Sequence, residues 1–201
     1  TGVNSLIFND IANNIASGEN SSAIGVFTEA SGIGSTAIGN QTEASGNYSI
    51  AMGTSTIASG ERSIAMGSSA SATGFNSITM GEATQASGSS SLAIGRQSQA
   101  TGDYSVAMGS GSIASGNSST ATGGSTASGS TSTAMGQSTA SGLYSTAMGQ
   151  NTEATQGWAT AMGTSTIASG IAATSMGRGT EASGNSSIST GKDTIASGDF
   201  S

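Results

Sequence analysis

The chain repeats itself every fourteen residues, and this period constrains its fold more than any other feature. Blocks of the form S-x-A-x-G end on a ladder of glycines that continues to Gly191. Blocks of the form T-x-A-S-G end on a second ladder, midway between the first. Two steps between Gly123 and Gly149 have thirteen residues, and both lose one residue in the turn after the first glycine. A register held this closely indicates a stacked repeat architecture.

Each block alternates with period 2 and is followed by a polar pair, which predicts two short strands and two tight turns per repeat. A helix is disfavoured, because glycine at every seventh position costs about 1 kcal/mol each relative to alanine. We therefore predict an all-β parallel solenoid, or β-roll, in which each strand pairs with its equivalent in the next coil. Disorder is the alternative for a chain rich in Gly, Ser and Thr, but flexible linkers do not keep such a register.

The glycines are expected to supply a positive φ or a close approach between backbones at the turns. Those of the first repeats are Gly25, Gly32, Gly39, Gly46, Gly53, Gly60, Gly67 and Gly74.

Composition excludes several classes of function. The 201 residues include 32 Gly but no His or Cys, so a Ser-His-Asp triad, a thiol nucleophile, a disulfide and a His or thiolate metal site are ruled out. Four Lys and Arg against eleven Asp and Glu argue against nucleic-acid binding. No apolar run approaches the roughly 20 residues of a membrane span. We therefore expect no enzyme, no cofactor and no membrane insertion by this piece.

Large aliphatic side chains gather on one face of the first block. Ser, Ala and Gly of S-x-A-x-G share one face, and the two variable positions share the other. All eight methionines lie on the second variable position. We call the following residues the apolar stripe: Ile50, Met52, Ile64, Met66, Ile78, Met80, Leu92, Ile94, Val106, Met108, Met135, Met148, Met162 and Met176.

The second block indicates which face lies inside the coil. Its variable positions recurrently hold Glu and Gln, which predicts a solvent-exposed face. The interior would then contain Ser, Thr, Ala and Gly, with the apolar stripe outside, where self-association would cover it. The alternative places Ile and Met inside a wider, monomeric solenoid.

Most aromatic residues cluster at one position, the second residue of the turn before S-x-A-x-G. They are Tyr48, Tyr104, Tyr144, Trp158 and Phe200, with Phe75 one residue earlier. A ladder of rings for ligand contact is one interpretation, and packing at the edges between protomers is the one we favour.

The repeat resembles the head repeats of YadA-like trimeric autotransporter adhesins, whose motif is close to N-S-V-A-I-G-x-x-S-x-A-x-G. NYSIAMGTSTIASG (47–60) and DYSVAMGSGSIASG (103–116) carry the resemblance, which covers roughly residues 14–201. The chain departs from the motif in preferring Met to Ile and in its Thr-rich coils between Gly123 and Gly177.

This resemblance implies a left-handed β-roll, assembly as a homotrimer through the apolar stripe, and display from a bacterial outer membrane. Residues 1–13 would form an irregular N-terminal coil, with a strand-like segment at 5–9 and a longer turn, before a head domain of about thirteen units at 14–201.

The function expected on this basis is attachment to host cells, extracellular matrix or environmental surfaces, with collagen as the first partner to test. An ice-binding solenoid is a second hypothesis, because stacked strands carry regular Ser and Thr ladders. Glutamates interrupt that ladder at Glu29, Glu43, Glu153 and Glu181. A segment of a phage or viral fibre is a third.

Overall fold

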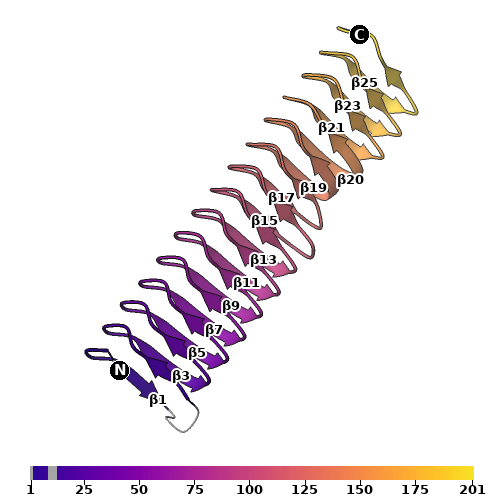
Figure 1. Cartoon of the computed structure of the whole chain (residues 1–201). Coiled ribbons are helices and arrows are strands. Elements are labelled where there is room, and N and C mark those ends of the chain that lie inside the picture. Colours follow the sequence, from indigo (N-terminus) through magenta and orange to yellow (C-terminus); the bar gives the residue numbers. More distant parts are fainter. Residues whose placement is uncertain (1, 9–12) are drawn as a thin grey trace. The chain divides into compact units, whose positions relative to one another are not determined.

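The computed structural model describes residues 2–8 and 13–201, and every regular element in these ranges is a β-strand (Figure 1). The chain divides into two compact units, Thr1–Tyr104 and Ser105–Ser201. Within each unit the strands pair in parallel with their equivalents one repeat further on. This confirms the predicted all-β parallel solenoid with fourteen-residue coils.

The first unit alternates longer and shorter strands. Their bounds are β1 (Leu6–Phe8), β2 (Ile15–Ala16), β3 (Ser22–Val26), β4 (Glu29–Ala30), β5 (Thr36–Asn40), β6 (Glu43–Ala44), β7 (Ile50–Thr54), β8 (Ile57–Ala58), β9 (Ile64–Ser68), β10 (Ser71–Ala72), β11 (Ile78–Glu82), β12 (Gln85–Ala86), β13 (Leu92–Arg96) and β14 (Gln99–Ala100).

The second unit follows the same plan with two merged strands. Its strands are β15 (Val106–Met108), β16 (Ile113–Ala114), β17 (Thr120–Thr122), β18 (Thr126–Ala127), β19 (Thr133–Ala140), β20 (Thr146–Ala154), β21 (Thr160–Thr164), β22 (Ile167–Ala168), β23 (Thr174–Arg178), β24 (Glu181–Ala182), β25 (Ile188–Lys192) and β26 (Ile195–Ala196).

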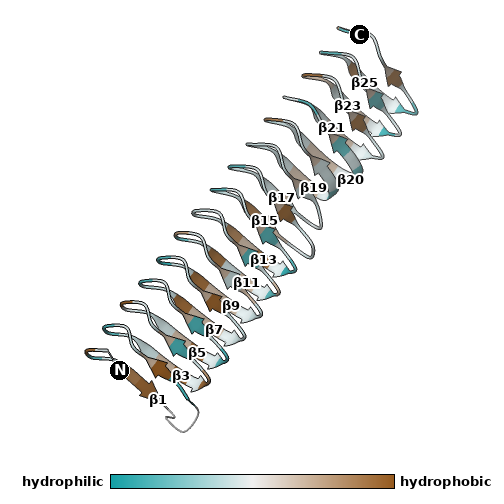
Figure 2. Ribbon diagram, in the orientation of Figure 1, coloured by the Kyte–Doolittle hydropathy of each residue, from teal (hydrophilic) through white to brown (hydrophobic). Residues whose placement is uncertain are grey.

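Strand register places identical repeat positions beside one another. In β7 and β9, Met52 lies opposite Met66, and in β6 and β8 Glu43 lies opposite Ile57. Backbone hydrogen bonds join the coils: the Ile50 amide, for example, donates to the Ser63 carbonyl at 2.9 Å. Each repeat position therefore forms a column along its unit, but the residue type can change within a column. In Figure 2 the short strands that hold Ile are brown, and those that hold Glu or Gln are teal.

The second block forms a shorter strand than its five-residue pattern predicts. Only the variable residue and the following alanine are strand, as in Ile57–Ala58. The next two amides, of Ser59 and Gly60, both donate to the Ala72 carbonyl oxygen, at 3.0 and 3.2 Å. Because two successive amides share one acceptor, the chain bends there and the regular ladder ends.

The merged strand β19 lies in one of the two thirteen-residue repeats. In the fourteen-residue repeats, the second residue after the first glycine turns the corner in the left-handed region, as at Ser55 (φ 54°) and Ser165 (φ 54°). Between Gly136 and Thr139 that corner residue is missing, and one strand runs through Thr133–Ala140. Its register shifts against β20 at this point.

The interior of each unit is narrow and contains small side chains. Alanines at the strand centres, such as Ala51 and Ala58, are completely buried, and the columns of Ser and Thr beside them are also buried. The largest fully buried side chains are threonines. The Ser/Thr/Ala interior is confirmed, and the alternative with Ile and Met inside the coil is excluded, because those side chains are partly exposed.

Within the predicted strand-like segment at 5–9, the structure has the strand β1 over Leu6–Phe8. β1 pairs with β3, with Leu6 opposite Ser22 and Ile7 opposite Ala23. The longer turn predicted after this strand falls on residues 9–12, which lie outside the described residues.

Candidate interaction surface

The apolar stripe occupies the outer face of the longer strands. In the first unit, Ile50, Met52, Ile64, Ile78, Met80, Leu92 and Ile94 are half-buried, and Met66 is exposed. In the second unit, Val106, Met148, Met162 and Met176 are half-buried, whereas Met108 and Met135 are exposed. The stripe consists of two parallel columns, because residues two apart on a strand share a face.

The two units differ in the chemistry of the first of these columns. Isoleucines stack in the first unit, with Ile50 opposite Ile64 and Ile64 opposite Ile78. In the second unit the same column is a threonine ladder, with register partners Thr120, Thr133, Thr146, Thr160 and Thr174. The outer face is therefore uniformly apolar from Ile50 to Ile94 in the first unit, and mixed Thr/Met from Thr133 to Met176 in the second.

The glycines of the first ladder sit inside the longer strands, and those of the second sit at the bends. Gly25, Gly39, Gly53 and Gly67 are the fourth residues of their strands, with φ between 126° and 137°. Gly32, Gly46, Gly60 and Gly74 follow the short strands and have no left-handed φ.

Close approach between coils explains both ladders. A Cβ on Gly53 would lie within 3 Å of two backbone atoms of Gly67, and a Cβ on Gly60 would lie 2.1 Å from the Gly74 carbonyl oxygen. At both positions the next coil therefore leaves no room for a side chain.

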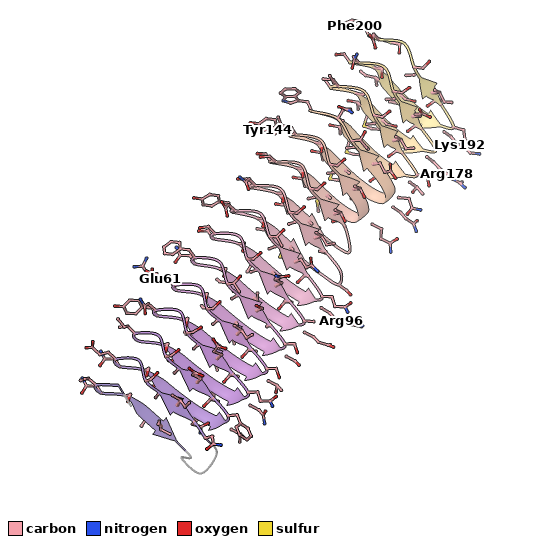
Figure 3. All side chains as sticks on the ribbon, in the orientation of Figure 1. Glu61, Arg96, Tyr144, Arg178, Lys192 and Phe200 are labelled. Carbon is pink, nitrogen blue, oxygen red and sulfur yellow. The ribbon has the colours of Figure 1, made fainter. Side chains whose placement is uncertain are left out.

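The aromatic column lies on an exposed corner in the left-handed region. Tyr48, Tyr104, Tyr144, Trp158 and Phe200 all have φ of 57–59° and are exposed. Tyr144 and Trp158 stack with ring centroids 5.9 Å apart and planes 17° apart. Figure 3 labels Tyr144 on this corner of the second unit.

Sequence reasoning treated these positions as ordinary turn residues and missed the left-handed backbone. The same column also holds Asn20, Gly34 and Asn76. Asn and Gly are the residues that adopt the left-handed conformation most readily, so their presence in this column could have indicated it.

Within the described residues, charged side chains form two ion pairs. Glu82 lies opposite Arg96, and Arg178 lies opposite Lys192, where the longer strands end. Lys192 Nζ is 3.7 Å from Asp193 Oδ2, and Figure 3 labels Arg178 and Lys192. Exposed pairs of this kind contribute little to stability.

The described parts of the chain, residues 2–8 and 13–201, contain no detected pocket and no group of three or more His, Cys, Asp or Glu side chains that could hold a metal ion. No helix long and apolar enough to cross a membrane occurs in these ranges. What the structure offers for recognition is therefore its columned outer surface.

Comparison with known proteins identifies the repeat. The profile of the YadA head domain repeat (two copies) matches residues 16–42, 30–56, 44–70, 58–81, 72–98, 86–112, 100–126, 127–152, 140–166 and 168–194. No curated protein matches the chain. The chain belongs to the YadA head family, a family of surface-displayed trimeric autotransporter adhesins rather than of enzymes.

Proposed function

We propose that the chain is an adhesin head that assembles as a homotrimer through the apolar stripe and attaches to host cells, extracellular matrix or environmental surfaces. The observation that supports this most is the half-exposed stripe on an otherwise small-residue solenoid. Display from a bacterial outer membrane follows from the family and is part of the same proposal.

Burial energetics favour assembly over a free single chain. Fully burying a Leu, Ile or Met side chain stabilises by about 1.5–3 kcal/mol relative to leaving it exposed. Most stripe residues are already half-buried, so covering them adds about 1 kcal/mol each. Repetition along the solenoid multiplies this gain, and the small interior of each unit offers little stability of its own.

Met66 and Ile57 provide a matched pair for testing the interface. Met66 lies in the stripe and is 37% exposed, while Ile57 lies on the outward face of the short strands and is 40% exposed. Met66→Asp is expected to weaken assembly, and Ile57→Asp is expected to leave it intact. Sedimentation velocity of both variants measures the difference, and equal behaviour would place the interface elsewhere.

Adhesion is tested with immobilised matrix proteins, beginning with fibrillar collagen, and with cultured cells. Three copies of one surface give avidity, so a chain that assembles should bind at least tenfold more tightly than Met66→Asp. Ile57→Asp should bind like the unaltered chain. Absence of binding to matrix proteins, to cells and to abiotic surfaces would refute the attachment function while leaving assembly to its own test.

Ice binding stays a second candidate because the second unit carries an in-register threonine ladder. The methionine column on the same face makes that surface mixed rather than uniformly hydroxylated. Membership of the YadA head family also favours adhesion over ice binding and over a segment of a viral fibre. Thermal hysteresis or ice shaping by the purified chain would support the ice-binding candidate, and their absence would remove it.

A further inference from the structure

The corner that precedes the longer strands carries an exposed apolar patch in the second unit. Its members come from three successive coils, and we call them the corner patch: Leu143, Tyr144, Trp158 and Ile171, all of them exposed. Backbone hydrogen bonds join these coils, as where the Trp158 amide donates to the Leu143 carbonyl at 2.8 Å. Large apolar side chains that are exposed together, unlike single ones, mark interaction sites.

One ring face in the corner patch is left uncovered by the neighbouring coils. Rings in this column lean toward the preceding coil: a Cβ on Gly34 would lie 2.9 Å from Cδ1 of Tyr48. In the same way Trp158 stacks on Tyr144. The opposite face of Trp158 meets the next residue of the column, Ala172, whose methyl group covers little of an indole. Trp158 is 58% exposed, so it presents a flat apolar surface to solvent.

The corner is distinct from the apolar stripe and holds charges that a dry contact would have to desolvate. Glu61 and Arg62 occupy the same turn in the first unit, with side chains 46% and 57% exposed. Asp199 occupies it in the second unit and is also exposed. Charged residues are depleted from the core of protein interfaces. These charges therefore favour a corner that stays in water when the stripe is covered, over packing at protomer edges.

Charge favours a neutral ligand at the corner patch. The two cations of the second unit, Arg178 and Lys192, are the last residues of β23 and β25. In Figure 3 they lie on the opposite edge of this unit from Tyr144. The formal net charge of the whole chain is −7, which repels polyanions. Sulfated or sialylated glycans, phosphates and nucleic acids are therefore disfavoured.

Shape favours a ligand that stacks over one that needs a pocket. Residues 2–8 and 13–201 form no detected pocket, and the hot-spot side chains of protein partners fill pockets. A pyranose ring needs none, because the C–H groups of one side rest on an aromatic face while the hydroxyls stay hydrated. Asn185, one coil beyond Ile171, accepts the Ile171 amide through Oδ1 at 3.1 Å, which leaves its amino group to donate to sugar hydroxyls.

We propose that the corner patch binds neutral glycans, with one pyranose ring stacked on the open face of Trp158 and with Ile171 and Asn185 beside it. The inference rests on the proposed function in one respect, because it names a ligand class for the attachment. A single stacked sugar binds weakly, with a Kd of the order of millimolar, and the three copies in a trimer add avidity.

Trp158 is the only tryptophan of the chain, so its fluorescence reports on this site alone. In the assembled chain it should emit at the long wavelength of a hydrated indole and be quenched by acrylamide. Cellotetraose or chitotetraose should shift the emission to shorter wavelength and reduce the quenching, whereas heparin and a polyproline peptide should change neither. An indole already shielded from acrylamide in the assembled chain, or no response to either tetrasaccharide, would overturn the proposal.

Variants of the whole chain test which ring binds the sugar. Trp158→Ala should bind each tetrasaccharide about tenfold more weakly in calorimetry, because it removes the stacking surface. Tyr48→Ala is the matched control: Tyr48 is also 58% exposed, but Arg62 follows it in the column, and its loss should leave binding unchanged. Full affinity in Trp158→Ala, with the fold verified by circular dichroism, would overturn the proposal.

Two further measurements keep the test decisive. If Trp158→Ala does not fold, Ile171→Ser retains the fluorescent reporter and should weaken tetrasaccharide binding about threefold, and unchanged binding would count against the site. Attachment to matrix proteins and cells is measured in parallel. Attachment without a Trp158 response would refute the glycan site and leave the proposed function standing, and a Trp158 response without attachment would support the glycan site and refute the attachment.

Discussion

Gly116→Ala and Gly111→Ala separate the two reasons for which this repeat uses glycine. The two residues lie five positions apart in the second unit. Gly116 has no left-handed φ, but a Cβ there would lie 2.0 Å from the Gly129 carbonyl oxygen. Gly111 has a φ of 70°, and a Cβ there would have nothing within 4 Å. The first variant therefore tests steric clash, and the second tests backbone strain.

The expected cost of Gly116→Ala follows from how far the coils must move. Ordinary contact begins near 3.4 Å, so the strands have to separate by about 1.4 Å at this point. That separation breaks the hydrogen bonds from the Ser115 and Gly116 amides to the Ala127 carbonyl, now 3.0 and 3.2 Å long. Losing two bonds at about 1 kcal/mol each, together with overpacking, gives about 3 kcal/mol.

Gly111→Ala is expected to cost much less. A non-glycine residue in the left-handed region costs about 1–2 kcal/mol, and the reduced entropy of the unfolded chain returns part of this. For a chain of this size, thermal melting followed by circular dichroism should show a fall in Tm of roughly 6–12 °C for Gly116→Ala and roughly 2–4 °C for Gly111→Ala.

Amide hydrogen exchange locates the damage, because stacked repeats open locally. Protection should fall around Ser115 and Ala127 in Gly116→Ala and stay nearly unchanged in Gly111→Ala. Equal melting temperatures for the two variants, or a larger loss for Gly111→Ala, would refute the reasoning from coil spacing.

Three further substitutions test the interior, the corners and the aromatic column by thermal melting. The buried Thr56 hydroxyl has no hydrogen-bond partner within the described residues, so Thr56→Val should stabilise the fold by about 1 kcal/mol. Thr180→Val is the contrasting variant: it removes a 2.7 Å hydrogen bond between the Thr180 hydroxyl and Ser175 Oγ, and it should destabilise the fold by about 1 kcal/mol. Ala83 has a φ of 52°, so Ala83→Gly should be neutral or slightly stabilising, while Ala58→Gly, in a buried strand, should cost about 1 kcal/mol. Trp158→Ala removes the stack on Tyr144 and should cost about 0.5–1.5 kcal/mol, a small loss for an aromatic residue because the ring is exposed.

Much of the architecture could be predicted from the sequence because each repeat position meets its own equivalent. Period-2 alternation in I-A-M-G placed Ile50 and Met52 on one face and Ala51 on the other, as found. Recurring Glu and Gln at positions such as Glu43 marked the outward face of the short strands correctly.

Other features depend on backbone geometry that residue types do not specify. Tyr48 and Trp158 adopt a left-handed φ although neither is glycine, because the corner backbone of the stacked coils fixes that conformation. Their rings are exposed, so neighbouring coils do not exclude them. The short strands end early because two amides share one carbonyl, a detail that the T-x-A-S-G pattern does not contain.

Light scattering on the purified chain measures whether the apolar stripe is covered by further copies. One chain has a mass of 19.1 kDa, and a homotrimer predicts about 57 kDa. Met66→Asp should lower that mass, and Ile57→Asp should not. A single species of about 19 kDa at micromolar concentration would contradict assembly through the stripe.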